Sequence, residues 1–516
     1  MQRLHTPQEA ARWLRQRVTG HLRTDSRHVH AGDALLAWPG AQHDARRYVP
    51  DVLARGASAC LVEEGGWVGA DALDPSLNHH VASYVNLKAA SGPIAAAYHE
   101  HPSHALDVLA VTGTNGKTST AWWLAQALSR LGRRCAVAGT LGMGEIEQDT
   151  QGRVAVVGAD TGMTTPDAVV WQSCLREMVD HGVRACAVEA SSIGLAEHRL
   201  DGTRIHAAVF TNFSQDHLDY HGDMPAYWQA KAALFDWQDL AVAVVNVDDP
   251  QGAQLATELR QRPGRALDVW TCSAQGAARL QARDIRQSRQ LAGGISANGQ
   301  GLSFEVVEGA QVLRLQTSLV GVFNVNNLLG VIATLRALGY SLSQAVNVCA
   351  DLWPVPGRLQ VVSSPSEPLV VVDYAHTPDA LSLVLQALRP LAAGRQGNLL
   401  CVVGCGGDRD TGKRAQMASA AEAHADRLLF TSDNPRSESP QAIVQAMLAG
   451  LSQPGRAQVE MDRARAIALA VTQADARDVV LIAGKGHESY QEIAGVRQPF
   501  SDEAQAREAL RQRRAA

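Results

Sequence analysis

The sequence predicts an α/β protein of three domains: a small α/β amino-terminal domain, a central doubly wound domain and a Rossmann-like carboxyl-terminal domain. The chain has 516 residues, several times the roughly 150 residues of one ordinary domain. Short apolar runs alternate with helical patterns along most of it, as in doubly wound folds. The prolines and glycine of WPVPGR, at 353–358, mark a boundary between two such series.

The amino-terminal domain is expected over 1–90, where the apolar runs ALLAW and ACLVEE stand between the polar loops TDSR and GAQHDARRY. A connector follows, because Pro102 and Ser103 interrupt a helical pattern just ahead of a strand. The central domain is expected over 91–353, with buried parallel strands at LDVLAVT, RACAVEA, HAAVFTNF and LAVAVVNV.

The carboxyl-terminal domain is expected over 354–516. Its predicted strands are PLVVVDYAH, NLLCVVGCG, DRLLFTS and DVVLIAGKG, and helical stretches such as PDALSLVLQALRPL separate them. Each strand ends in polar or glycine-containing residues. In a Rossmann-like domain the ligand lies at these carboxyl ends.

Composition favours a soluble globular protein, with 46% hydrophobic and 19% charged residues. The net charge is -5 and basic residues form no block, so we expect no nucleic-acid partner. The first twenty residues lack a signal-peptide core, and no apolar run is long enough for membrane insertion. The eight cysteines are scattered without metal-binding spacing, which favours buried thiols in a cytoplasmic protein.

The stretch LAVTGTNGKTST, at 109–120, has the strand, loop and helix of a P-loop-type ATP site. Gly113 and Gly116 allow a tight turn with amide groups aimed at phosphate, Lys117 can reach the terminal phosphates, and Thr118 can ligate magnesium. Val111 stands where the common loop has its first glycine. An ordinary glycine-bearing turn is the alternative. The predicted nucleotide-binding residues here are Thr112, Gly113, Thr114, Asn115, Gly116, Lys117 and Thr118.

Two further residues are candidate metal ligands. Glu189 ends the strand RACAVEA, where a carboxylate beside a phosphate loop can bind Mg²⁺ directly or through water, or else cap a helix. His217, in SQDHLDYH, is the weaker candidate, since magnesium prefers oxygen and a lone histidine is more often structural.

Lys231 lies on the apolar face of the helix PAYWQAKAALFDW. Most lysines in such a position extend to water. The alternative is a desolvated amine with a lowered pKa, which can take up carbon dioxide as a carbamate. That carbamate would supply oxygen ligands to a second magnesium ion.

The motifs VTGTNGKT, VEASS, DHLDYH and YWQAK together resemble the Mur ligase family of ATP-dependent peptide synthases, over nearly the whole chain. The resemblance implies a nucleotide-sugar domain, a central ATPase domain and an amino-acid domain, in that order. It also implies carbamylated Lys231 and two Mg²⁺ ions, one at Thr118 and Glu189 and one at His217 and Lys231. Residues that resemble the family's adenine-side and nucleotide-closing positions are Asn324, Asn327, Arg358 and Asp373.

The resemblance also implies the acid substrate, UDP-N-acetylmuramoyl-L-alanyl-D-glutamate. Loops similar to the uridine-binding loops contain Thr24, Ser26, Gln42 and His43. Positions similar to those that hold the muramoyl dipeptide are Thr164, Thr165, Ser191, Glu197 and Arg199. Glu197 stands where many relatives have glutamine, so its contact with the substrate stays open.

The motif SDNPRSE resembles the family's signature for meso-diaminopimelate. Arg436 can clamp the far carboxylate of this amino acid bidentately, a group that L-lysine lacks. The resemblance implies that Arg409, Gly484 and Glu488 complete the pocket, with Glu488 pairing with the far ammonium. A helix-starting turn is the alternative for this motif. The motif residues are Asp433, Asn434, Pro435 and Arg436.

The implied reaction is an amide ligation in peptidoglycan precursor synthesis. ATP phosphorylates the D-glutamate γ-carboxylate, and the diaminopimelate amine attacks the resulting acyl phosphate. Closure of the third domain over the second is expected before this chemistry, in a protein expected to be a monomer. The implied catalytic residues are Lys117, Glu189, His217 and Lys231.

Two other functions fit parts of the sequence. A folylpolyglutamate synthase shares the loop and the ligase chemistry, but the predicted sugar-nucleotide domain and the DNPR motif speak against it. A regulatory or mechanical NTPase would hydrolyse ATP without any amino acid, so turnover with and without diaminopimelate distinguishes it.

Overall fold

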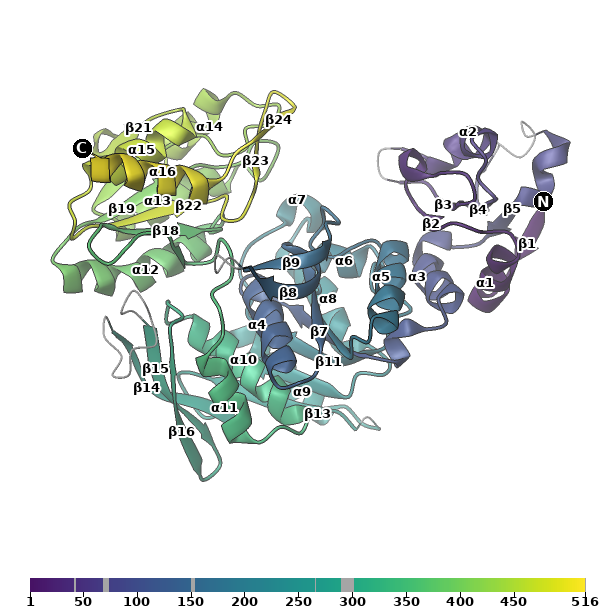
Figure 1. Ribbon diagram of the computed structural model, residues 1–516, viewed down its shortest axis with the longest axis horizontal. Helices are drawn as coiled ribbons and strands as arrows, with labels where there is room; N and C mark the ends of the chain where they lie inside the picture. The colour runs from purple at the N-terminus through teal and green to yellow at the C-terminus, as the bar shows by residue number, and fades with distance from the viewer. Residues whose placement is uncertain (41–42, 68–73, 150–153, 265, 289–300, 516) are drawn as a thin grey trace.

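The computed structural model describes residues 1–40, 43–67, 74–149, 154–264, 266–288 and 301–515. Its described strands form three large sheets and one hairpin, and helices flank the large sheets (Figure 1). The α/β class predicted from the sequence is confirmed, because all three large sheets contain parallel strands and are flanked by helices. No helix within the described ranges is long and apolar enough to cross a membrane.

The first sheet is all-parallel, with its described strands in the order β1-β5-β4-β3-β2. Successive side chains of a strand point to opposite faces of this sheet. Leu36 packs against α1 and α3 on one face, and Leu35 packs against α2 on the other. The elements are β1 (Gln2–Leu4), α1 (Pro7–Arg15), β2 (Leu22–Arg23), β3 (Ala34–Ala37), α2 (Val49–Ala54), β4 (Ala59–Glu63), β5 (Val81–Tyr84) and α3 (Leu87–Tyr98).

Helix α3 runs through the predicted domain boundary at residue 90. Its Leu87, Ile94 and Ala95 pack in the core of the first sheet. The domain bounds stay a prediction, and this packing favours an amino-terminal domain that includes all of α3.

The central sheet has the described strand order β16-β15-β14-β13-β12-β11-β6-β10-β7-β8-β9. Strands β14 to β7 of this order are parallel, and antiparallel arms extend the sheet at both ends. The strands are β6 (Asp107–Thr112), β7 (Cys135–Gly139), β8 (Gly142–Gln148), β9 (Val154–Ala159), β10 (Ala185–Glu189), β11 (Ile205–Phe210), β12 (Val242–Asn246), β13 (Asp268–Ser273), β14 (Leu280–Ser288), β15 (Gly301–Glu308) and β16 (Gln311–Thr317).

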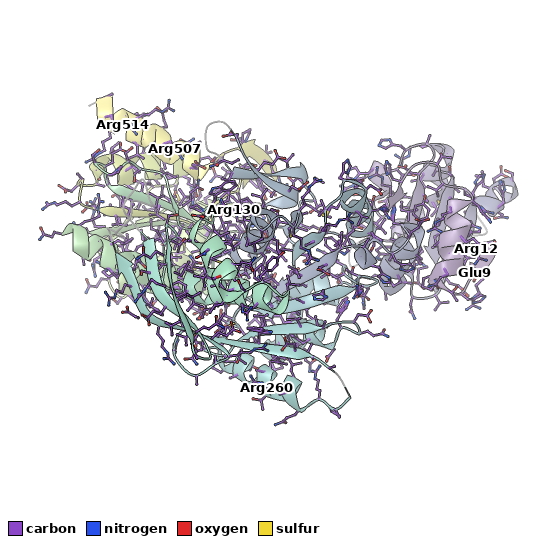
Figure 2. All side chains as sticks on the ribbon, turned by 60° about the horizontal axis from the view of Figure 1, so that its bottom comes forward. Glu9, Arg12, Arg130, Arg260, Arg507 and Arg514 are labelled. Carbon is purple, nitrogen blue, oxygen red and sulfur yellow. The ribbon has the colours of Figure 1, made fainter. Side chains whose placement is uncertain are left out.

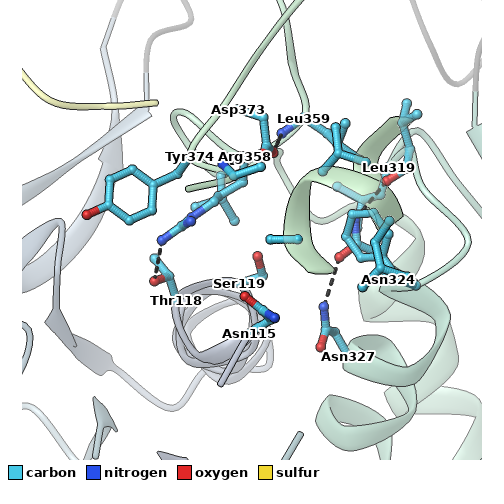
Figure 3. Close-up of a pocket in the computed structure, with 18 of the residues that line it drawn as sticks. Asn115, Thr118, Ser119, Leu319, Asn324, Asn327, Arg358, Leu359, Asp373 and Tyr374 are labelled. Carbon is cyan, nitrogen blue, oxygen red and sulfur yellow. Dashed lines mark hydrogen bonds between the residues drawn. The ribbon is translucent and has the colours of Figure 1, made fainter. Parts of the chain in front are cut away.

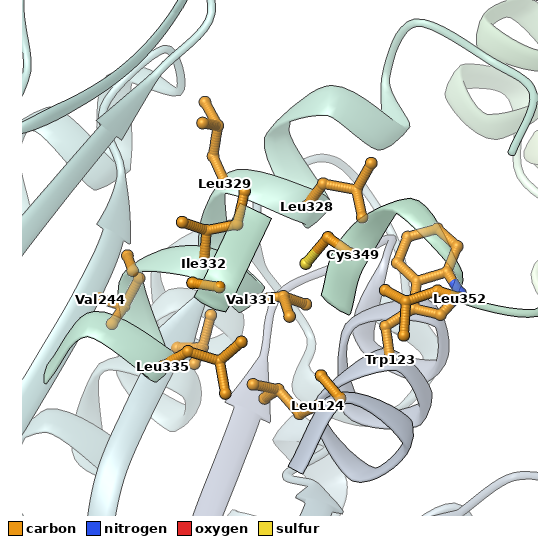
Figure 4. Close-up of a cluster of buried hydrophobic side chains, with 14 of the residues drawn as sticks. Trp123, Leu124, Val244, Leu328, Leu329, Val331, Ile332, Leu335, Cys349 and Leu352 are labelled. Atoms are coloured by element: carbon orange, nitrogen blue, oxygen red, sulfur yellow. The ribbon is translucent and has the colours of Figure 1, made fainter. Parts of the chain in front are cut away.

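Helices cover both faces of this sheet. Side chains of α4, α10 and α11 interdigitate on one face, including Trp123, Leu328 and Cys349 (Figure 4). Trp171 of α5 and Leu255 of α9 pack on the other face. The helices are α4 (Lys117–Arg130), α5 (Ala168–Asp180), α6 (Ser192–Ala196), α7 (Leu218–His221), α8 (Met224–Ala232), α9 (Pro250–Gln261), α10 (Asn324–Ala337) and α11 (Leu342–Ala350).

The third sheet has the described order β17-β18-β22-β19-β20-β21, parallel except for β17. The carboxyl ends of β18, β22, β19 and β20 therefore share one edge. The elements are β17 (Gln360–Val361), β18 (Leu369–Asp373), α12 (Pro378–Arg395), β19 (Leu399–Val403), α13 (Lys413–His424), β20 (Arg427–Phe430), α14 (Pro440–Leu448), β21 (Ala457–Val459), α15 (Arg463–Gln473), β22 (Val479–Ala483), the hairpin β23 (Tyr490–Ile493) and β24 (Val496–Pro499), and α16 (Asp502–Ala515).

Contacts join the central domain to both neighbours. Lys88 of α3 lies 2.7 Å from a carboxylate oxygen of Glu197, after α6. Gln287 Nε2 of β14 donates to the carbonyl of Ala387 in α12 at 2.9 Å. The third domain is thus touched by the antiparallel arm as well as joined through the chain.

Surface charge is spread over the molecule. Arg12 is exposed on α1, Arg260 on α9, and Arg507 and Arg514 on α16, and Figure 2 shows these three positions far apart. The eight cysteines are all free, and all are buried except the half-buried Cys174.

Candidate functional site

The P-loop joins β6 to α4 in a conformation that needs its glycines. Gly113 and Gly116 have φ angles of 143° and 85°. A Cβ at Gly113 would collide with Thr211 Oγ1, and one at Gly116 with the amide of Asn327. The neighbouring strand-to-helix loop fixes this backbone, since Asn212 Oδ1 accepts from the Asn115 amide at 2.8 Å. The loop is therefore a rigid cradle at the amino end of α4, as anion binding requires.

Lys117 folds over its own loop. Its Nζ donates to the carbonyls of Gly113 at 2.9 Å and Thr114 at 2.8 Å. Burial lowers the pKa of this ammonium, with the nearby Glu189 acting in the opposite direction. The lysine stands where it can reach the end of a phosphate chain laid along the loop.

Thr118 and Glu189 come together from α4 and β10. The Thr118 hydroxyl donates to Glu189 Oε2 at 2.8 Å, and both residues are buried. The other carboxylate oxygen accepts from the Thr140 amide at 2.8 Å. Arg358, from the third domain, donates to Thr118 Oγ1 at 3.0 Å. One hydroxyl and one carboxylate converge beside the phosphate cradle, which is a donor set suited to Mg²⁺.

Lys231 is 1% exposed and faces the same loop. Its Nζ donates to the Gly113 carbonyl at 2.7 Å and lies 4.4 Å from the centre of the Tyr227 ring. Burial lowers the pKa of Lys231 well below that of an ordinary lysine, and the charge of Lys117 lowers it further. The structure therefore favours the desolvated amine over a lysine that extends to water.

His217 and Lys231 both lie close to the Tyr227 ring. The ring centre of His217 is 6.1 Å from that of Tyr227, and His217 Nε2 is 3.5 Å from Asp216 Oδ2. Burial lowers the pKa of His217 to about 4, so the imidazole is neutral at pH 7. A neutral imidazole has a free lone pair for a metal.

Asp216 belongs to this cluster although sequence analysis did not single it out. Its carboxylate contacts His217 and adds a negative charge beside Lys117 and Lys231. Burial raises the pKa of Asp216, but the charges of His376, His217 and Lys413 outweigh it and lower the pKa overall. Its place next to His217 in SQDHLDYH was the available signal.

A cavity of about 1110 Å³ opens from the P-loop toward the third domain (Figure 3). Asn324 and Asn327 line it from the start of α10, linked by a 2.9 Å hydrogen bond between their side-chain amides. Asp373 lines it from the end of β18 and accepts from the amides of Leu359 and Ala375 at 2.7 Å each. Burial raises the pKa of Asp373.

Arg358 spans the cavity. Its guanidinium lies 4.4 Å from the centre of the Tyr374 ring and reaches Thr118 of the P-loop helix. The four nucleotide-side residues suggested by the family resemblance thus border one cavity with the P-loop.

The residues assigned to the muramoyl dipeptide gather beside Glu189. Thr165 Oγ1 donates to the Glu189 carbonyl at 2.6 Å and lies 2.9 Å from Ser191 Oγ. Arg199 donates to the Thr165 carbonyl at 3.0 Å. Thr164 accepts from the Thr140 hydroxyl at 3.2 Å. This cluster adjoins the predicted metal position through the Glu189 backbone.

Glu197 is engaged by protein groups. Its carboxylate pairs with Lys88 and accepts a hydrogen bond from the Tyr220 hydroxyl. Burial raises the pKa of Glu197, and these two partners outweigh it and lower the pKa. Lys88 and Tyr220 thus stabilise the negative charge of Glu197 beside the proposed site of an acidic substrate.

Three of the predicted uridine-binding residues, Thr24, Ser26 and His43, belong to the first domain, which lies across the central domain from the third (Figure 1). The Thr24 side chain hydrogen-bonds Asp167, the amino-terminal cap of α5. The Ser26 carbonyl accepts from Arg55 at 2.6 Å, and that of His43 accepts from the Gly40 amide at 2.8 Å. Gln42 lies outside the described residues.

The DNPR motif follows β20, beside the ends of β19 and β22. Arg436 has a φ of 52°, and its guanidinium donates to the Gly407 carbonyl at 2.7 Å. A Cβ at Gly484 would collide with Asp433. Arg409 is exposed, close to Gly406 on the same edge. Loops from three strands therefore form one polar site, with Pro435 inside the turn.

Two buried cations in this region escaped sequence analysis. Arg463 pairs with Asp502 at 2.7 Å and also donates to the carbonyls of Ser432 and Ala483, next to the two ligand loops. Lys485 is fully buried and pairs with Glu488 at 2.8 Å. In the sequence, the one signal for Lys485 was its position inside the motif AGKGHE. Most lysines are exposed, so nothing in the sequence indicated that this one would be buried.

Comparison with known proteins places this architecture in a family. The model of the Mur ligase middle domain matches residues 111–335, and that of the Mur ligase glutamate ligase domain matches 357–486. The UDP-N-acetylmuramoyl-L-alanyl-D-glutamate--2,6-diaminopimelate ligase of Acidovorax sp. (strain JS42) is 56% identical over 99% of this chain and 98% of its own length. The enzyme of the same name from Janthinobacterium sp. (strain Marseille) is 46% identical over 95% of this chain and 94% of its own length.

Solved structures agree. A UDP-N-acetylmuramoyl-L-alanyl-D-glutamate--2,6-diaminopimelate ligase is 35% identical, with a TM-score of 0.62 over 96% of this chain and 95% of its own. A folylpolyglutamate synthase of Mycobacterium tuberculosis is 19% identical, with a TM-score of 0.58 over 77% of this chain and 92% of its own. The second likeness concerns the fold alone.

Proposed function

Because this chain belongs to the Mur ligase family and is an ATP-dependent ligase that joins diaminopimelate to UDP-N-acetylmuramoyl-L-alanyl-D-glutamate, we propose a mechanism built on the P-loop and the three domains. The carboxylate of D-glutamate attacks the terminal phosphorus of ATP, and ADP leaves. The amine of meso-diaminopimelate then attacks the acyl phosphate, and the tetrahedral intermediate loses inorganic phosphate and a proton to give the amide.

The P-loop supplies the first step. Its amides and Lys117 hold the terminal phosphates and neutralise the charge that develops during transfer. Asn324 and Asn327 bind the adenine side, and Arg358 and Asp373 close over the nucleotide from the third domain. The observation that carries this proposal is one cavity, which Gly116 and Thr118 of the P-loop border together with Asn324, Asn327, Arg358 and Asp373.

Two magnesium ions are proposed. The buried Thr118 hydroxyl and Glu189 carboxylate, 2.8 Å apart, fit one of them. The neutral imidazole of His217 and a carbamate on Lys231 fit the other, because Lys231 is buried with a strongly lowered pKa. Magnesium bound there would hold donor and acceptor in line and neutralise phosphoryl oxygens.

The acid substrate spans two domains in this proposal. Its uridine end binds the loops of Thr24, Ser26, Gln42 and His43, and its dipeptide end binds Thr164, Thr165, Ser191 and Arg199. Glu197 acts through its partners Lys88 and Tyr220, since both of these occupy its carboxylate. All of these residues lie in one chain, and we propose that the enzyme acts as a monomer. The free cysteines fit a reducing compartment, and we propose action in the cytoplasm.

The acceptor binds at the third sheet. Arg436 and Arg409 hold the far carboxylate of diaminopimelate, and Glu488 holds its far ammonium. Asp433, Asn434, Pro435 and Gly484 shape the loops around it.

One experiment tests the acceptor and the reaction together. ADP release is measured on the dipeptide substrate with meso-diaminopimelate, with L-lysine and with no acceptor. Turnover only with diaminopimelate is expected. Rapid ADP release without any acceptor would indicate a simple NTPase, and equal rates with lysine would contradict the role of Arg436.

The acyl phosphate has its own test. Substrate labelled with heavy oxygen in the γ-carboxylate is expected to deliver one labelled oxygen to inorganic phosphate. Unlabelled phosphate would rule this intermediate out.

A further inference from the structure

Lys485 is a buried cation to which the mechanism above gives no role. It follows β22 directly after Gly484, and its side chain is 0% exposed. Its Nζ donates to Asn434 Oδ1 at 3.0 Å and to Glu488 Oε2 at 2.8 Å, and lies 5.5 Å from the centre of the Tyr490 ring. One lysine thus touches two of the residues proposed to bind diaminopimelate.

The donors around Asn434 decide how its amide is oriented. An ammonium and a backbone N–H can only donate, and both Lys485 Nζ and the Glu492 amide, at 2.9 Å, meet the same atom of Asn434. That atom is therefore the oxygen. The amide nitrogen then faces Glu488 and donates to its Oε2 at 2.7 Å.

The same network orients the carboxylate of Glu488. Oε2 accepts from both Lys485 and Asn434, whereas Oε1 accepts from no residue in the described part of the chain. The Glu488 side chain is 20% exposed, so the carboxylate reaches the site. One oxygen is held by the protein and the other is left for a ligand.

We propose that Lys485 is a positioning residue that determines specificity for the far ammonium of the acceptor, by holding Glu488 Oε2 and so presenting Glu488 Oε1 to the ligand. Without the lysine, the Glu492 amide still orients Asn434, but Glu488 Oε2 keeps one donor in place of two, so the carboxylate can rotate and the ammonium loses an oriented acceptor. This role rests on the proposed binding of diaminopimelate at Glu488.

The test compares Lys485→Met with the wild type on two acceptors. One is meso-diaminopimelate. The other is 2-aminopimelate, which keeps the far carboxylate and lacks the far ammonium. Loss of one charge-assisted contact is expected to raise the KM for diaminopimelate about 10- to 100-fold and to reduce the preference over 2-aminopimelate by a similar factor. The KM values for ATP and the dipeptide substrate are expected to stay unchanged.

Arg497→Met is the matched control. Arg497 is a cation whose guanidinium lies 4.5 Å from the centre of the same Tyr490 ring, but it pairs with Glu492 and is exposed. Its loss is expected to leave the preference between the two acceptors intact. An equal loss of preference in Arg497→Met would show that removing any nearby positive charge has this effect, and it would overturn the proposal.

Lys485→Met alone leaves the Glu488 carboxylate without its cation and can therefore unfold the domain. If Lys485→Met does not fold, the test is the double variant Lys485→Met with Glu488→Gln, which removes both charges. Its preference between the acceptors is expected to equal that of Glu488→Gln alone, because Lys485 acts through Glu488. Independent, additive losses would contradict the proposal, as would an unchanged preference in Lys485→Met. A wild type that does not use diaminopimelate would instead refute the proposed function.

Discussion

At the scale of single residues, the site combines cations that are held close together by burial. Lys117 and Lys231 both donate to the Gly113 carbonyl, and each lowers the pKa of a neighbour. Two ammonium groups this close repel each other, so the site has a lower free energy when Lys231 is uncharged. The chemistry proposed for Lys231 follows from this crowding.

Activity is expected to depend on carbon dioxide through Lys231. A carbamate forms from the uncharged amine, so its population grows as the pH rises through the lowered pKa of Lys231 and falls below it. Activity after exhaustive degassing should drop and return on adding bicarbonate, and ¹³C-labelled bicarbonate should give a carbamate NMR signal. Lys231→Met should lose about 100-fold or more in kcat.

Lys231→Met is also the control, because it should show neither the signal nor a response to bicarbonate. Full activity of the wild type in carbon dioxide-free buffer would contradict the carbamate.

Arg436→Lys tests recognition of the far carboxylate. Its guanidinium is oriented by the Gly407 carbonyl, and an ammonium cannot reproduce the planar bidentate contact. The kcat/KM for meso-diaminopimelate is expected to fall about 10- to 100-fold, with the KM for ATP unchanged. A variant as active as the wild type would show that another residue holds this carboxylate.

At the scale of elements, four of the parallel strands in the central sheet were predicted from the sequence, whereas the parallel strands β7 and β13 and the antiparallel arms were not. The apolar runs of β6, β10, β11 and β12 stand out because both faces are buried: Val108 packs on one side of the sheet and Leu109 on the other. Strands β8, β9 and β14 mix polar residues with apolar ones at the sheet ends, and their short-range pattern resembles loops.

The same contrast holds in the site. The glycine loop and Glu189 have local signatures in the sequence. Lys485 and Asp216 stand beside motif residues in the sequence, but their contacts depend on which strand ends meet in the fold, and the local pattern does not contain that information.

Helix α11 begins with a capping box whose contribution can be measured. The Ser341 hydroxyl accepts from the Gln344 amide, and the Gln344 side chain accepts from the Ser341 amide. Ser341→Ala is expected to lower the free energy of unfolding by about 1 kcal/mol, as urea denaturation would show. Ser341→Asn, which keeps an accepting cap, should lose much less. Equal losses in both would point to packing instead of the cap.

At the scale of the whole molecule, the half-buried His99 links stability to pH. Burial lowers the pKa of His99 to about 4, and the charges of Arg15, Arg176 and His21 add to this. The ordinary value is 6.5, so between about pH 4 and 6.5 the unfolded chain binds more protons than the folded one. Stability therefore falls as the pH falls through this window.

His99→Gln is expected to make that dependence less steep, by up to about 1.4 kcal/mol per pH unit. Thermal or urea unfolding at several pH values between 4 and 7 measures it. The control is His28→Gln, whose imidazole is 71% exposed. If His99→Gln and the wild type lose stability in parallel as the pH falls, the histidine is not the titrating group.

The antiparallel arm of the central sheet has a consequence for how the third domain moves. The chain enters that domain at 354–358, between α11 and β17, and β14 touches it again through the hydrogen bond from Gln287 to Ala387. We expect these two attachments to limit the motion of the third domain mainly to rotation about the axis that joins them, with the hydrogen bond from Arg358 to Thr118 made or broken as the domain turns. The approach of the acceptor amine to the activated acid would then depend on that rotation.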